Sequence, residues 1–239
     1  MIFIIISIFS GFILTLIVSL LFLFLKQRTP VNILPYRDLR GELINQAKKG
    51  RLPSSATHRP SNLDTRVNSA VSQRMRAFNT NPPTNAKQRV ALFRLFTQVI
   101  DSIHEELDAI GGGGYPVDLI AEPRRVVFTV YWFESEINNG GFDQWYLNLS
   151  GSTACDAPEA LRTLGFESIA GLVERANMVF PNQPPRDRTL RLSQMDDISE
   201  SDSELWDTLS TEFYESDIDC QSVMIRYILE NESHFFLSD

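Results

Sequence analysis

The sequence predicts an all-α, compact, acidic domain preceded by a membrane helix and a basic linker. Apolar residues recur every three or four positions through the C-terminal 150 residues, no alternating strand patterns separate them, and the first 25 residues carry no charge. The chain has 239 residues, of which 43% are hydrophobic, with 22 Lys+Arg against 30 Asp+Glu. This composition excludes a collagen-like, rod-like or fully disordered protein. With only two cysteines, a disulfide framework and a Cys-rich metal site are also excluded.

Residues 1–25 are expected to form a single-pass transmembrane helix. The apolar stretch 2–25 would be about 36 Å long as a helix, against a bilayer core of about 30 Å. A cleaved signal peptide requires a basic start and a small-x-small cleavage site, and neither is present. Lys26 and Arg28 follow the stretch, whereas no basic side chain precedes it. The positive-inside rule therefore predicts an inner-membrane location with the C-terminal domain in the cytoplasm.

Residues 26–86 are expected to form a basic, largely disordered linker. Residues 26–95 contain 14 Lys+Arg and 3 Asp+Glu, a net charge of +11, and much of this part is rich in Pro, Ser, Asn and Thr. Two short amphipathic helices fit within it, at 35–50 and 62–78. A basic helix of this kind binds anionic membrane lipid. The simpler interpretation is a solvated linker whose charges only set the topology.

Residues 87–239 are expected to form the helical domain. Residues 87–110 carry a long apolar stripe, with Asn85 and Gln88 suited to cap its start and glycines 111–114 to end it. Residues 122–138 have a strand-like composition, but Pro123 suits a first helical turn and a helical face is present, which favours a helix. Further helices are expected at 142–149, 157–164 and 167–180, followed by a loop at 181–201.

Two helices are expected to complete the domain. Ser201-x-x-Glu204 resembles a capping box that opens a helix with Trp206, Leu209 and Phe213 facing inward. Residues 218–235 would form the last helix. Its inward side chains would be Cys220, Val223, Met224, Tyr227, Ile228 and Phe235.

No catalytic, metal or cofactor site is predicted. The glycines at 111–114 lack the Lys-Ser/Thr of a phosphate-binding loop, and nothing local supports Cys155 as a nucleophile with His104 or His234 as its base. Glu134 and Glu136 are two residues apart, so a helix would place them on different faces, which is poor geometry for sharing an ion. A non-enzymatic role is expected.

A run of carboxylates is the candidate binding surface. Residues 96–239 contain 8 Arg, no Lys and 27 Asp+Glu, a net charge of −19. No basic residue interrupts the run Asp196, Asp197, Glu200, Asp202, Glu204, Asp207, Glu212, Glu215, Asp217 and Asp219. Like charges three or four residues apart on a helix repel each other and destabilise it. A sequence that keeps such charges despite this cost suggests that their negative electrostatic field has a function. Carboxylate rows can imitate the phosphates of DNA, while an acidic surface that only confers solubility is the alternative.

Residues 136–151 read E-I-N-N-G-G-F-D-Q-W-Y-L-N-L-S-G. This segment resembles the signature of a bacterial DNA-mimic protein family, domain of unknown function 4375. Weaker matches follow at 157–165, 176–180, 209–214 and 227–235, with Arg188 as the arginine after the loop, so the resemblance covers about 90–239. The signature itself is expected to be structural, with Glu136, Asn138, Asn139, Gly140, Gly141, Phe142, Gln144, Trp145 and Asn148 as its members.

The resemblance implies an all-helical acidic domain that binds a DNA-binding transcriptional regulator by imitating duplex DNA. The expected partner is thus a basic protein, and the acidic domain itself is not expected to bind nucleic acid. Two alternatives remain open: an immunity or scaffold protein that binds another basic partner, and an enzyme with an unrecognised site. A further hypothesis is that the basic linker folds onto the acidic domain and masks it.

Overall fold

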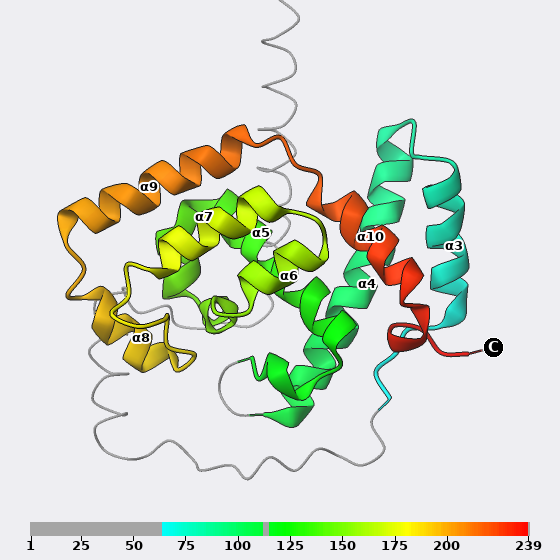
Figure 1. Ribbon diagram of the computed structural model, residues 1–239. Helices are drawn as coiled ribbons and strands as arrows, with labels where there is room; N and C mark the ends of the chain where they lie inside the picture. Colours follow the sequence, from blue (N-terminus) through cyan, green and yellow to red (C-terminus); the bar gives the residue numbers. More distant parts are fainter. Residues whose placement is uncertain (1–63, 112–114, 239) are drawn as a thin grey trace, which may run out of the picture. The chain divides into compact units, whose positions relative to one another are not determined.

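The computed structural model describes residues 64–111 and 115–238, and this part of the chain is helical throughout (Figure 1). The α-helices are α3 (Ser69–Thr80), α4 (Ala86–Ile110), α5 (Glu122–Leu147), α6 (Ala157–Thr163), α7 (Glu167–Asn177), α8 (Arg188–Met195), α9 (Glu200–Glu215) and α10 (Cys220–Glu230). Short 3-10 helices occur at η1 (Val117–Leu119), η2 (Leu149–Thr153) and η3 (Glu232–His234). Within these residues the only β-type pairing is an isolated bridge between Val67 and Phe236. The all-α prediction is confirmed for them.

The predicted membrane helix at 2–25 and the helix expected at 35–50 lie outside the described residues. Among the helices of 64–111 and 115–238, none combines the length and apolar character needed to cross a membrane.

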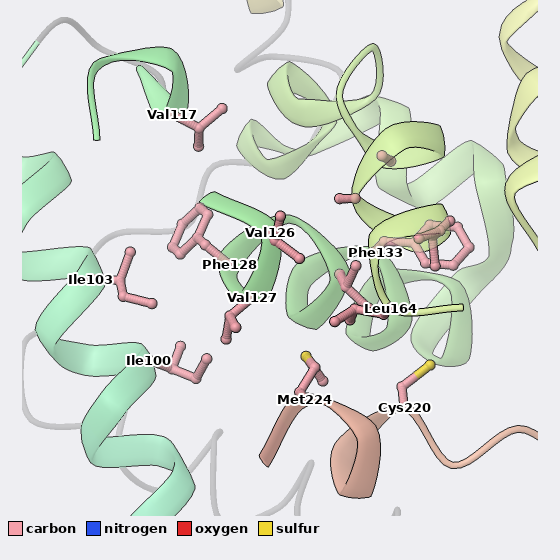
Figure 2. Packing of buried hydrophobic residues seen from close by; sticks show 14 of the residues in the cluster. Ile100, Ile103, Val117, Val126, Val127, Phe128, Phe133, Leu164, Cys220 and Met224 are labelled. Atoms are coloured by element: carbon pink, nitrogen blue, oxygen red, sulfur yellow. The ribbon is translucent and has the colours of Figure 1, made fainter. Parts of the chain in front are cut away.

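Helix α5 is the centre of the domain. It contacts α4, α6, α8, α9 and α10, so most of the core is built on its sides. Figure 2 shows Ile100 and Ile103 of α4, Val127 and Phe133 of α5, and Met224 of α10 within one apolar cluster. All five side chains are 2% exposed or less. Residues 126–133 have the composition of a strand but form a helix. A helix that is buried on several sides accommodates large apolar residues around most of its circumference.

The predicted start of α4 is confirmed. The Asn85 side chain accepts a hydrogen bond from the Gln88 N–H at 3.0 Å, and the Gln88 side chain accepts one from the Thr84 N–H at 2.9 Å. The helix ends at Gly111, whose φ of 77° suits glycine.

Two predictions around the acidic run are wrong. Residues 181–201 are not only a loop, because α8 lies within them. Helix α9 begins two residues earlier than expected: Ser199 is its N-cap, and its hydroxyl oxygen accepts a hydrogen bond from the Asp202 N–H at 3.2 Å. Ser199-x-x-Asp202 and Ser201-x-x-Glu204 have the same pattern, and the chain uses the first. The inward positions of Trp206, Leu209 and Phe213 are confirmed.

Residues 64–80, placed in the flexible linker by the sequence, pack on the domain. Val71 and Met75 of α3 are buried, and α3 contacts α4 and α10. The Val67 N–H donates to the Phe235 carbonyl and the Leu237 N–H donates to the Val67 carbonyl, both at 2.8 Å. The helix expected at 62–78 is confirmed as α3, which begins seven residues later.

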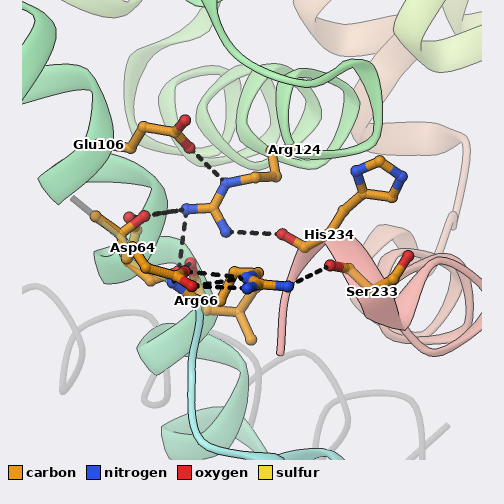
Figure 3. A network of polar contacts seen from close by, with 9 residues as sticks. Asp64, Arg66, Glu106, Arg124, Ser233 and His234 are labelled. Atoms are coloured by element: carbon orange, nitrogen blue, oxygen red, sulfur yellow. Dashed lines mark hydrogen bonds and ion pairs between the residues drawn. The ribbon is translucent and has the colours of Figure 1, made fainter. Parts of the chain in front are cut away.

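Arg124 joins four segments at this edge (Figure 3). Its guanidinium donates hydrogen bonds to the Thr65 hydroxyl, the Ser102 carbonyl and the His234 carbonyl at 2.9, 2.9 and 3.1 Å. Its Nε lies 2.7 Å from a Glu106 carboxylate oxygen, which makes a buried ion pair. Burial lowers the Arg124 pKa, and the Glu106 charge opposes that shift. The segment before α3 is therefore part of the folded domain.

Candidate partner-binding surface

The glycine pair of the motif makes a kink inside α5. Gly140 and Gly141 have non-helical dihedral angles, and the φ of Gly141 is 75°. A Cβ atom at Gly141 would lie 2.7 Å from the Ser210 hydroxyl oxygen of α9. Glycine is therefore required here both by its backbone conformation and by the close approach of α9. The predicted helix stop is confirmed as a kink, after which a second helical segment continues to Leu147.

Glu136 is a structural residue of this motif. Its buried carboxylate accepts hydrogen bonds from the side chains of Gln144, Asn148 and Ser150 at 3.1, 2.7 and 2.8 Å. All three donors follow the kink, so the carboxylate before the kink ties the two parts of α5 to each other and to η2. Phe142 and Trp145 are fully buried, whereas Asn138 and Asn139 are exposed at the kink.

A buried arginine, rather than an apolar stripe, holds helix α8 against the domain. Arg191 is 0% exposed and donates to the carbonyls of Tyr146 and Asn148 at 2.8 and 2.7 Å, and to those of Pro185 and Arg186 at 2.6 and 3.1 Å. Burial, followed by the charge of Arg188, lowers the Arg191 pKa from 12.5 to about 10, so the side chain stays charged at neutral pH. Arg188, singled out by the family resemblance, donates to the Leu147 carbonyl at 2.8 Å.

Helix α9 is fixed to the domain through its inner face. The Ser210 hydroxyl accepts a hydrogen bond from the Phe142 N–H at 3.1 Å and donates one to the Trp206 carbonyl at 2.7 Å. The Tyr214 hydroxyl donates to the Ile137 carbonyl at 2.6 Å, close to the kink. Trp206 donates to the Ala176 carbonyl of α7 at 3.0 Å. Figure 1 shows α9 running beside α5 and α7, in agreement with its contacts.

The opposite face of α9 carries four of the predicted carboxylates, and four more lie exposed in the segments that flank the helix. Eight of the ten candidates are exposed: Asp196, Asp197, Glu200, Glu204, Asp207, Glu215, Asp217 and Asp219. Asp202 accepts a hydrogen bond from the Ser199 hydroxyl, and Glu212 forms an ion pair with Arg175 at 2.9 Å. Asp219 also caps α10 by accepting from the Ser222 N–H at 2.9 Å. The structure therefore brings the run together on one rigid element and its two flanking turns.

Three of these carboxylates form a row. Glu200, Glu204 and Asp207 follow one another at helical spacings of four and three residues, so they point to the same side of α9. They span about 10 Å of helix, with successive charges about 6 and 4.5 Å apart along the axis, and DNA carries one phosphate per about 3.4 Å of axis on each strand. The row is therefore a regular line of negative charges, with a spacing about one and a half times that of the phosphates of one DNA strand.

Asp143 of α5 extends the row, which the sequence did not indicate. Its side chain is exposed, and burial followed by the charge of Asp207 raises its pKa. It lies 64 residues from Asp207 in sequence, so only the kink and the packing of α9 bring the two charges together. The sequence motif marked the region around the kink, but Asp143 occupies a variable position of that motif and was therefore not singled out.

The basic side chains of the domain leave the outer face of α9 largely unneutralised. In residues 115–238, six arginines are engaged in hydrogen bonds or ion pairs within the domain: Arg124, Arg162, Arg175, Arg186, Arg188 and Arg191. Glu212 forms its ion pair with Arg175, whereas Glu200, Glu204 and Asp207 of the row are exposed.

Glu134 and Glu136 point in different directions, as expected. Glu134 faces α10, where burial and then the charge of Asp219 raise its pKa from 4.5 to about 7. The nearby Cys220 thiol is buried, which raises its pKa well above the usual value. Residues 64–111 and 115–238 contain no cluster of His, Cys, Asp and Glu that would hold a metal ion.

Residues 118–231 match the family model described as DMP19-like protein. No curated protein and no solved structure matches the chain. The matched segment begins at η1 and ends after α10, so it contains the kink motif, Arg191 and all of α9, and leaves out α3 and α4. This is narrower than the resemblance at about 90–239, and it supports the DNA-mimic character of that resemblance. Residues 118–231 are thus similar to the DMP19-like proteins.

Proposed function

We propose that the domain is a DNA mimic that binds a DNA-binding protein through the outer face of α9. The observation that carries the proposal is the row of Glu200, Glu204 and Asp207, which is exposed on a helix whose inner face is fixed to the kink motif. The similarity of residues 118–231 to DMP19-like proteins supports the same function. The partner is a basic protein, and a transcriptional regulator is the expected class.

The fixed position of α9 distinguishes this surface from an acidic surface that only confers solubility. A flexible acidic segment loses conformational entropy when a partner aligns its charges. The α9 row is already aligned, because Ser210 and Tyr214 hold the helix against α5. Binding should be driven by charge and should weaken steeply as salt screens the carboxylates.

Affinity capture from native cytosol, with residues 64–239 as bait, tests the proposal. The bait begins at residue 64 because α3 covers part of the core. We expect a DNA-binding protein that elutes at moderate salt and is lost from a bait carrying Glu200→Gln, Glu204→Gln and Asp207→Asn. The matched control carries Glu105→Gln, Glu159→Gln and Glu230→Gln, which remove the same charge at exposed positions elsewhere.

The outcome of the capture separates the functions considered. A partner that the control bait retains and the α9 variant loses supports the carboxylate row. A salt-insensitive partner, or one that both variants lose equally, contradicts it. A basic nuclease-type protein that duplex DNA does not displace would favour an immunity function instead.

We further propose that residues 1–25 anchor the domain at the inner membrane and face it to the cytoplasm. The support is the uncharged apolar stretch and the basic residues that follow it. Protease added outside intact cells should leave the domain uncut, and digestion of the domain would contradict the topology.

A further inference from the structure

The first half of α4 carries an exposed stripe in which two apolar side chains lie between two basic ones. Val90 is 46% exposed and Phe93 is 38% exposed. Lys87 and Arg94 are exposed as well, at three residues before and four residues after Val90. These helical spacings place the four side chains on one side of α4. We call Lys87, Val90, Phe93 and Arg94 the α4 stripe.

The surroundings of the α4 stripe are positively charged, in contrast to the rest of the domain. Residues 65–100 contain six Lys+Arg and no Asp or Glu. Two of these six pair with carboxylates, Arg66 with Asp64 and Arg76 with Glu232. The other four, namely Arg74, Lys87, Arg89 and Arg94, are exposed. This part lies outside residues 118–231, so it is an addition to the matched segment.

Helix α3 does not offer a comparable surface. The sequence suggested that a helix at 62–78 lies on anionic lipid with its apolar face, but Val71 and Met75 of that face are buried in the core. The apolar side chains of α3 therefore stabilise the domain. Only α4 combines exposed apolar and basic side chains on one side within this helical pair.

We propose that the α4 stripe docks on an anionic phospholipid surface. Lys87 and Arg94 would contact lipid phosphates, and Val90 and Phe93 would enter the boundary between headgroups and acyl chains. This inference rests on the proposed membrane attachment, which keeps the domain close to lipid: 38 residues separate the end of the predicted membrane helix from residue 64.

The carboxylate row of a second copy is the other surface of suitable charge, and it fits the α4 stripe less well. The row and its neighbours Thr208 and Thr211 are polar, so they would leave Phe93 without an apolar contact. A bilayer supplies both the phosphates and the apolar layer. The two exposed apolar side chains are therefore better explained by lipid than by self-association.

The test uses the full chain with Phe93→Trp, reconstituted into vesicles of brominated phosphatidylcholine with or without phosphatidylglycerol. Leu190→Trp is the matched control, because Leu190 is an exposed apolar residue of α8 at 53% exposure. The parent chain gives the background of its three tryptophans. We expect quenching of the Phe93→Trp emission only when phosphatidylglycerol is present, and no such quenching at position 190.

Removing the charges should reverse the effect. Lys87→Gln with Arg94→Gln in the Phe93→Trp chain should shift the docking equilibrium about 30-fold toward the undocked state, since each cation near an anionic surface contributes about a factor of five. Equal quenching in both lipids, or none in either, would overturn the proposal. A concentration-dependent blue shift without vesicles would also overturn it and would assign the α4 stripe to a second copy.

The membrane anchor is tested separately by flotation of the full chain with pure phosphatidylcholine vesicles. Failure to float would contradict the anchor. Flotation that appears only with phosphatidylglycerol and requires Lys87 and Arg94 would still support the α4 stripe.

Discussion

Replacing Glu134 by glutamine should stabilise the domain, and by an amount that depends on pH. The pKa of this half-buried carboxyl is raised from 4.5 to about 7 by burial and by Asp219, so above pH 7 the folded state holds a charge in an unfavourable place. A pKa difference of about 2.5 corresponds to about 3 kcal/mol. Since the folded state binds the proton more tightly, the free energy of unfolding of the wild type rises as the pH falls from 8 toward 4.5.

The assay is urea denaturation of residues 64–239 followed by circular dichroism at pH 8 and pH 5. Glu134→Gln removes the charge but keeps the shape, so we expect a gain of about 3 kcal/mol at pH 8 that shrinks to about 1 kcal/mol at pH 5. With an m value of about 2 kcal/mol/M, the midpoint at pH 8 should rise by about 1.5 M urea. Glu105→Gln, at an exposed position, is the control. A gain that is the same at both pH values would refute the reasoning.

Three further predictions concern stability. Arg191→Met should lower the free energy of unfolding by about 3–5 kcal/mol, because four backbone carbonyls lose a charged donor that is itself buried; unchanged urea denaturation would contradict this. Gly141→Ala should cost about 2 kcal/mol or more, and Ser210→Ala in the same chain should recover part of that loss in thermal unfolding. Burial lowers the pKa of His104, whose Nε2 accepts a hydrogen bond from a tryptophan, so the stability that it contributes above pH 6.5 should be lost as the pH falls. His104→Gln should therefore flatten this pH dependence, and an unchanged slope would argue against it.

Local signals in the sequence were sufficient for several elements. The cap of Asn85 and Gln88 fixed the start of α4, and the pair Gly140 and Gly141 marked the interruption of α5. Burial predictions succeeded where apolar residues recur at helical spacing, as in the inner face of α9 with Trp206. These features depend on side chains a few residues apart.

Features that depend on distant partners were not predictable. Helix α8 has few apolar residues, since its main inward side chain is Arg191, and the carbonyls that receive it lie up to 45 residues away. Val67 pairs with Phe235 and Leu237 near the other end of the chain, and the composition of the segment around Val67 gives no sign of these distant partners. Asp143 joins the α9 row only through the kink. The carboxylate run was visible in sequence, but its division into exposed, capping and paired members was not.

The most direct test of DNA mimicry is displacement of DNA from the captured partner. A fluorescent duplex bound to that partner is titrated with residues 64–239, and its anisotropy is followed at several salt concentrations. We predict that the domain releases the duplex completely. The variant with Glu200→Gln, Glu204→Gln and Asp207→Asn should need a much higher concentration, whereas the control at Glu105, Glu159 and Glu230 behaves as the wild type. A stable ternary complex of partner, duplex and domain would contradict the account.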